Sequence, residues 1–95
     1  MEISTSSNIV NISGSIKSVN DFQSIKNLLD ELKEKEKSIT LNIIDSISIT
    51  SSIIGYFNKL VLKDKINLQI NVGTEQLMEL FSDLHLCEEF KAKKI

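Results

Sequence analysis

Polar and apolar residues alternate in two segments of this chain, and the alternation predicts two strands that each bury one face. In residues 38–44, isoleucine and leucine alternate with Ser, Thr and Asn, and in residues 66–72, four apolar residues alternate with Asn and Gln. A repeat of two is the side-chain period of a strand. Residues 8–13 predict another strand, which ends at the turn residue Gly14. Ile3 marks a short strand that pairs with it.

Three other segments place apolar residues every three or four positions, which predicts amphipathic helices. The first helix begins at Val19, with Ser18 or Asn20 as its cap, and ends near Lys35. The second follows the junction at residues 50–52. The third begins after Gly73. Residues 86–92 are expected to form a short last helix or strand.

The elements therefore alternate as β-β-α-β-α-β-α, which implies parallel neighbouring strands joined by right-handed crossovers. A parallel sheet covered on both faces has strands that are apolar throughout, whereas these strands are polar at every second position. We therefore predict a two-layer α/β fold with a mixed, mostly parallel sheet of four or five strands and all helices on one face. The chain has no proline and no linker, so residues 1–95 are expected to form a single domain.

Composition narrows the function classes. The net charge is −2, and the lysines of residues 31–37 alternate with glutamates, which is typical of a solvated helix face and argues against nucleic-acid binding. No apolar run reaches the roughly 20 residues that a membrane-spanning helix needs. The first residues lack the features of a signal peptide, so we expect a cytoplasmic protein with no membrane insertion.

Candidate catalytic and metal-binding residues are scarce. Cys87 and His85 are each the single residue of their type, so no zinc-type cluster can form, and we expect no metal and no cofactor. Asp45 ends a strand close to Ser51, but no activating base or glycine-rich loop accompanies the pair. We therefore read Asp45 as a turn or capping residue, and Cys87 as a small buried apolar side chain. The sequence predicts a binding module that is not an enzyme.

Three adjacent hydroxyl residues, Thr50, Ser51 and Ser52, stand where a strand gives way to the second helix. One of them suffices to cap the helix, so three leave room for another role. A helix start also accepts a phosphate, because its first N–H groups have no partner in the helix. The apolar residues around the junction would form a docking patch for a partner if they are exposed; they are Ile47, Ile49, Ile53 and Ile54.

These features resemble the STAS domain, the fold of bacterial anti-sigma factor antagonists, over almost the whole chain. The stretch from Thr50 to Gly55 is similar to the family's Asp-Ser-Ser-Gly-Leu-Gly, and residues 13–16 and 41–45 are similar to its Ser-Gly-Glu-Leu and Val-Leu-Asp-Leu segments. Thr50 stands in place of the family aspartate, and Ile53 in place of its first glycine. The resemblance implies phosphorylation on Ser51. A second alignment, to STAS-like regulators with Asn-Thr-Ser-Ser, makes Thr50 the acceptor.

The resemblance implies a partner-switching regulator of bacterial transcription signalling. Its partner would be an anti-sigma factor or a serine kinase of the histidine-kinase-like ATPase type, with a metal-dependent phosphatase that removes the phosphate. An alternative is a STAS subunit that is never phosphorylated and belongs to a larger complex, either a stressosome-like particle or a lipid-transport assembly. Permanent docking at the same helix start would then replace switching.

Overall fold

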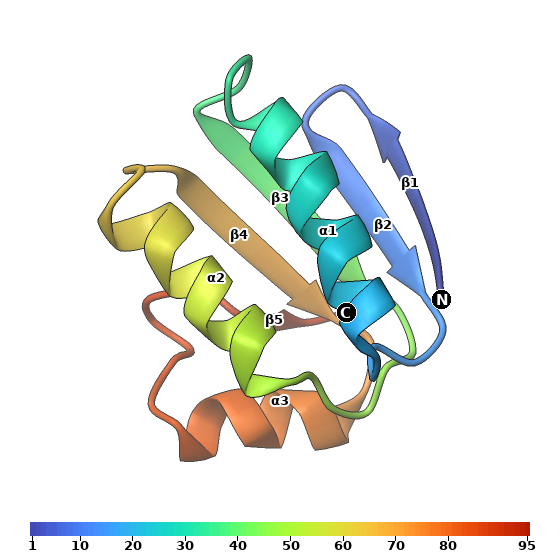
Figure 1. The fold of residues 1–95 in the computed structure, drawn as a ribbon. Helices are drawn as coiled ribbons and strands as arrows, with labels where there is room; N and C mark the ends of the chain where they lie inside the picture. Colours follow the sequence, from blue (N-terminus) through green and yellow to red (C-terminus); the bar gives the residue numbers. More distant parts are fainter.

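The structure is a computed structural model that describes residues 1–95 (Figure 1). Five strands and three helices follow one another along the chain in this order: β1 (Glu2–Ser6), β2 (Ile9–Ser13), α1 (Val19–Leu32), β3 (Ser38–Ile43), α2 (Ser51–Leu62), β4 (Asn67–Val72), α3 (Glu75–Asp83) and β5 (Lys93–Lys94). None of the helices is long and apolar enough to cross a membrane.

The strands form one sheet in the spatial order β1-β2-β3-β4-β5. β1 pairs with β2 in antiparallel orientation, and every other neighbouring pair is parallel. This arrangement confirms the predicted α/β class and the mostly parallel sheet. Each parallel connection carries a helix, so the amino-terminal ends of the helices gather at the end of the sheet where the parallel strands finish (Figure 1).

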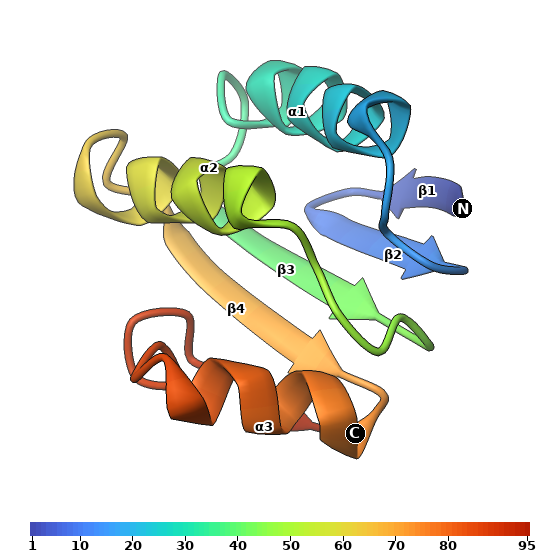
Figure 2. The ribbon, with the colours of Figure 1, turned by 60° about the horizontal axis from the view of Figure 1, so that its bottom comes forward.

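α1 and α2 cover one face of the sheet, as the alternating strands predict, and α3 lies beside β4 and β5 (Figure 2); the buried residues of all three helices join one core. In register, Leu41 of β3 lies beside Ile70 of β4, and both side chains are fully buried with the apolar residues of the helices in one core of 20 residues. The opposite face is polar. There the Asn42 amide donates to Asn11, and the Asn71 amide donates to Asn42, each at 2.8 Å, which links three strands through their side chains.

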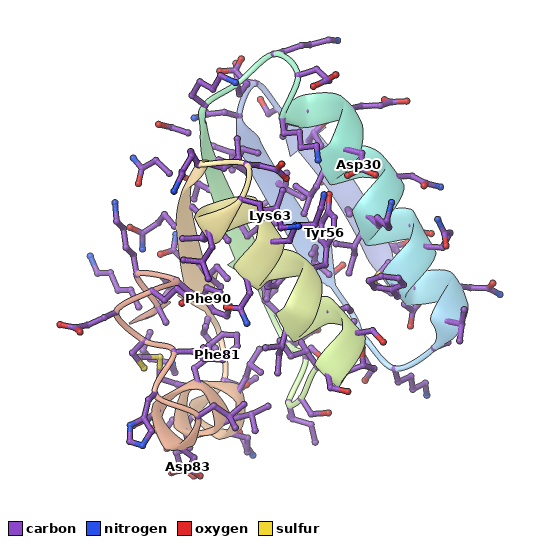
Figure 3. All side chains as sticks on the ribbon, turned by 60° about the vertical axis from the view of Figure 1, so that its left-hand side comes forward. Asp30, Tyr56, Lys63, Phe81, Asp83 and Phe90 are labelled. Atoms are coloured by element: carbon purple, nitrogen blue, oxygen red, sulfur yellow. The ribbon has the colours of Figure 1, made fainter.

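The carboxyl-terminal segment enters the core through one aromatic residue. Phe90 is fully buried, and its ring meets those of Phe57 in α2 and Phe81 in α3 edge to face, with centroids 5.9 and 5.6 Å apart (Figure 3). The prediction of a helix or strand over residues 86–92 is wrong. The backbone is left-handed at His85, before Phe90, and again at Lys91, after it, and the last strand is confined to Lys93–Lys94.

The first helix begins at Val19, as predicted, but it ends before Lys35. It ends at Leu32, and residues 33–35 form a turn, because the lysines and glutamates that follow offer no apolar side chain to the core. Val19 has the spacing of the apolar stripe that Phe22 and Ile25 continue, but its side chain is 81% exposed. Ser18 is the cap: its hydroxyl accepts from the Asp21 N–H, while the Asp21 carboxylate accepts from the Ser18 N–H.

Candidate functional site

Three loops meet at the end of the sheet where β2, β3 and β4 finish, and hydrogen bonds join them. The Asp45 carboxylate accepts from the Gly14 N–H at 2.5 Å, so it ties the β3–α2 loop to the β2–α1 loop and caps no helix. The Ser46 hydroxyl accepts from the Ile16 N–H at 3.1 Å. The Thr74 hydroxyl donates to the Ser46 carbonyl at 3.0 Å. These bonds fix the segment that leads into α2.

Ser46 is the centre of this arrangement, and sequence reasoning missed it. It is 1% exposed and is the only buried polar residue of the chain. Besides accepting from Ile16, its hydroxyl donates to the Ser48 carbonyl at 2.6 Å, so both hydrogen-bonding capacities of the group are used in the core. In the sequence, Ser46 follows Asp45 in a stretch with several serines and isoleucines, and no pattern distinguishes it from the other serines.

A glycine allows the loops to approach so closely. A Cβ placed on Gly73 would come within 1.8 Å of the Ile44 carbonyl oxygen, which is far inside van der Waals contact. The Gly73 N–H also donates to the Ile43 carbonyl at 2.8 Å. The end of β4 is therefore held against the start of the β3–α2 loop by backbone atoms alone, and no side chain fits between them.

The three predicted hydroxyl residues differ in their surroundings. Thr50 is the N-cap of α2: it is half-buried, and its hydroxyl accepts from the Ile53 N–H at 3.3 Å. Ser51 and Ser52 are the first two residues of the helix, and both are exposed. The N–H groups of these two positions have no acceptor within an α-helix. The threonine therefore caps the helix, whereas the two serines are exposed and do not serve as its cap.

The start of α2 also differs electrostatically from those of the other helices. α1 carries Asp21 in its first turn and α3 carries Glu75, whereas α2 has no acidic residue there. An acidic group in the first turn offsets the partial positive charge of a helix start. In α2 that charge is left uncompensated next to Ser51 and Ser52.

A hollow of about 310 Å³ opens between the starts of α1 and α2. Both polar and apolar side chains line it: Lys17, Ser18, Val19, Phe22, Thr50 and Ser52. No pattern in the sequence placed Lys17 or Val19 at this site. An exposed apolar residue at the first position of a helix, as Val19 is, could have drawn attention to this surface.

The isoleucines around the junction divide into two pairs. Ile49 and Ile53 are 8% and 0% exposed, and both belong to the core, so the prediction that they contact a partner is wrong. Their place on the inner side of the loop and helix explains the burial. Ile47 is 58% exposed, and Ile54 is half-buried at the edge of the core. Of the four isoleucines, only Ile47 and Ile54 can therefore contribute to a surface at the start of α2.

A buried tyrosine joins α1 and α2 to each other at a distance from their starts. The Tyr56 hydroxyl donates to the Asp30 carboxylate at 2.5 Å, and Lys26 contacts the other carboxylate oxygen at 2.8 Å (Figure 3). The hydrogen bonds from Lys26 and Tyr56 lower the Asp30 pKa to about 2. Burial, reinforced by the bond to Asp30, raises the pKa of Tyr56. This contact fixes α2 against α1 and so holds the walls of the hollow.

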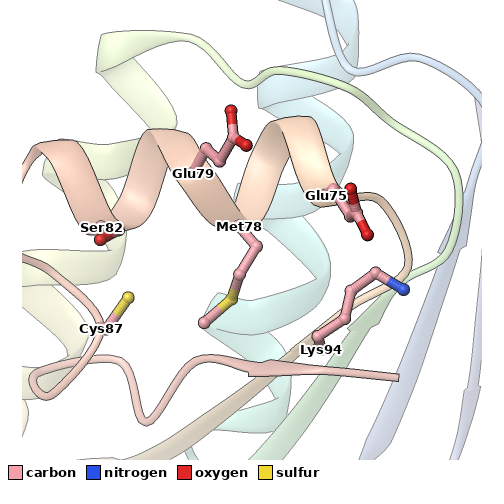
Figure 4. Close-up of a pocket in the computed structure, with 6 residues that line it drawn as sticks. All are labelled: Glu75, Met78, Glu79, Ser82, Cys87 and Lys94. Carbon is pink, nitrogen blue, oxygen red and sulfur yellow. The ribbon is translucent and has the colours of Figure 1, made fainter.

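A second hollow, of about 330 Å³, lies between α3 and the last residues of the chain (Figure 4). Its lining includes Met78, Ser82 and the half-buried Cys87, with Glu75 and Lys94 at its other end. It shares no residue with the hollow at the start of α2. No group of three or more His, Cys, Asp or Glu side chains in the structure could hold a metal ion.

No family model, curated protein or solved structure matches this chain.

Proposed function

We propose that this chain is a non-enzymatic partner-switching regulator, similar to the anti-sigma factor antagonists, and that phosphorylation at the start of α2 controls its binding to a protein partner. The observation that carries the proposal is the division of roles at this helix start. Thr50 caps the helix, which leaves Ser51 and Ser52 exposed beside N–H groups whose partial charge no acidic side chain offsets.

A phosphate on Ser51 or Ser52 would leave the fold intact. It carries close to two negative charges at neutral pH, and the start of α2 favours negative charge. Lys17 lines the same hollow as Ser52 and adds a nearby positive charge. Thr50 is the weakest candidate acceptor, because its half-buried hydroxyl already accepts from the helix backbone.

The partner would contact the apolar side chains next to these serines. Val19 and Ile47 are the most exposed of them, and Phe22 and Ile54 are half-buried. A partner that packs over this surface would have to strip water from an added dianion, which is costly. The unmodified chain therefore binds, and the phosphorylated chain releases its partner. We propose an anti-sigma factor or a related serine kinase as that partner, on the strength of the family resemblance alone.

The test compares charge at the helix start with the same charge elsewhere. Ser51→Ala, Ser51→Asp and Ser24→Asp chains serve as baits, and Ser24 is the control because it is exposed in the middle of α1. We expect Ser51→Ala and Ser24→Asp to retain the partner and Ser51→Asp to lose it, while all three remain folded by circular dichroism. Ser52→Ala and Ser52→Asp, compared with the same Ser24→Asp control, separate the two acceptors. Equal retention by all baits would contradict the proposal.

Phosphopeptide mapping of the protein from its native cells provides the complementary measurement. We expect one phosphate between Thr50 and Ser52. An unmodified chain that co-purifies with one stoichiometric complex would favour the alternative, a structural subunit that docks permanently through the same surface.

A further inference from the structure

The two edge strands of the sheet differ in how well they are protected against pairing with a strand of another chain. β5 consists of Lys93 and Lys94 alone, and short length and lysine are two devices by which proteins prevent an edge strand from pairing with another chain. β1 is five residues long and contains neither lysine nor proline. No helix or loop lies beyond its outer edge (Figures 1 and 2). β1 is therefore the open edge of the sheet.

The pairing on the inner side of β2 shows which groups of β1 face outward. The Asn8 and Ile12 carbonyls accept from the N–H groups of Thr40 and Ile44, each at 2.9 Å. Because backbone groups alternate in direction along a strand, the even-numbered residues of β2 face β3 and the odd-numbered ones face β1.

The register of the hairpin then assigns the groups of β1. The odd-numbered residues of β2 are the partners of Glu2, Ser4 and Ser6, so the backbone of these three residues bonds inward. Ile3 and Thr5 direct their N–H and carbonyl groups away from the sheet. The outer edge thus presents two donors and two acceptors that the hairpin does not use.

We propose that a second copy of this chain pairs with this edge, β1 against β1 in antiparallel orientation, with a two-fold axis at Ser4. In this register Ile3 lies opposite the second copy's Thr5, and the symmetry repeats the pair. Both residues of each pair face outward, so each pair forms two main-chain hydrogen bonds, four in total. Two five-stranded sheets become one continuous sheet of ten strands.

The side chains of β1 are compatible with this symmetric register. On the polar face, Ser4 meets its own symmetry mate, and Glu2 lies opposite the second copy's Ser6, so no two like charges face each other. On the core face, the half-buried Ile3 lies beside the threonine methyl group of the second copy. A register shifted to place Glu2 opposite Glu2 would bring the two carboxylates together and lose this fit.

The contact is small, which sets its strength. Two strands of five residues bury less than the roughly 1,200 Å² of a typical stable interface. The dimer is therefore weak and reversible, and depends on protein concentration. It is independent of the proposed switch, because residues 2–6 include no residue of the site at the start of α2.

Ser6 allows a test by reversal of charge at one position. Ser6 is exposed, and in the proposed register each copy of it faces the other chain's Glu2. Sedimentation analysis from about 10 µM to about 1 mM protein measures the dissociation constant. We expect Ser6→Lys to tighten the dimer and Ser6→Glu to weaken it, each by roughly 2- to 30-fold, since two charge pairs form per dimer. Raising the salt concentration should shrink both effects.

Amide hydrogen exchange supplies a measurement at single residues. We expect the Ile3 and Thr5 N–H groups to become more protected as concentration rises, with the amides of Ser4 and Ser6 unchanged. Two results would overturn the proposal: a chain that stays monomeric at every concentration, or a dimer on which the charge at residue 6 has no effect. Pairing of β1 only with a strand from another protein would overturn it as well.

Discussion

Tyr56 and Asp30 hold α2 against α1: the buried hydroxyl donates to the carboxylate at 2.5 Å across the gap between the two helices. Lys26 completes the contact, because it pairs with Asp30 and lies over the Tyr56 ring at 5.9 Å from its centroid. The two helices whose starts form the candidate site are thus fixed to each other about one and a half turns into α2 and about three turns into α1.

Removal of the hydroxyl should loosen this contact without a change in shape. We expect Tyr56→Phe to lower the free energy of unfolding by about 1–2 kcal/mol, since it deletes one hydrogen bond to a charged group that keeps its lysine partner. Denaturant unfolding of Tyr56→Phe, Asp30→Ala and the double variant gives the coupling energy. Additive losses would show that the two side chains do not stabilise each other.

The lowered pKa of Asp30, about 2, links this contact to acid stability. A carboxyl group whose pKa is lower in the folded chain contributes stability above its ordinary pKa near 4, and this contribution is lost as pH falls toward 2. Asp21 and Asp64 have lowered pKa values too, so they share the acid sensitivity. In unfolding measurements from pH 7 to pH 2, we expect Asp30→Asn to lose less stability than the native chain below about pH 4. If the free energy of unfolding fell equally with pH in Asp30→Asn and in the native chain, Asp30 would not contribute to the acid sensitivity.

Two glycines should respond in opposite directions to the same substitution. Gly73→Ala places a Cβ 1.8 Å from the Ile44 carbonyl oxygen, so we expect a loss of at least about 3 kcal/mol or failure to fold. Gly55 lies in the middle of α2 with no atom within 4 Å of the added Cβ. Gly55→Ala should therefore stabilise the chain by about 1 kcal/mol. Thermal melts of both variants compare the two, and a well-folded Gly73→Ala chain would contradict the close approach.

The layers of this fold could be predicted from the sequence, but the hydrogen bonds that join its loops could not. Alternation in residues 38–44 and 66–72 predicted the strands and their polar face, because burial on one side imposes a repeat of two. The role of Ser46 could not be predicted, since its partners Ile16 and Thr74 are 30 and 28 residues away in the chain. Hydrogen bonds over such separations leave no periodic pattern.

The same limit applies to the candidate site. The three hydroxyls and the helix start were predictable from local sequence, because a cap precedes its helix directly. Burial of Ile49 and Ile53, and exposure of Val19, depend on how the loop and helices sit over the sheet. A stripe of apolar residues indicates which side of a helix faces the core, but it does not show where the core ends.

The roles of the hydroxyls at residues 50–52 can be separated by stability alone, before any partner is known. Thr50→Ala removes the cap of α2, and we expect it to lower the free energy of unfolding by about 0.5–2 kcal/mol. Ser51→Ala and Ser52→Ala remove exposed hydroxyls and should change it by less than about 0.5 kcal/mol. Denaturant unfolding of the three variants makes the comparison. If Ser51→Ala or Ser52→Ala were as costly as Thr50→Ala, the serines would be needed for the fold, and the proposal that they are free for modification would lose its basis.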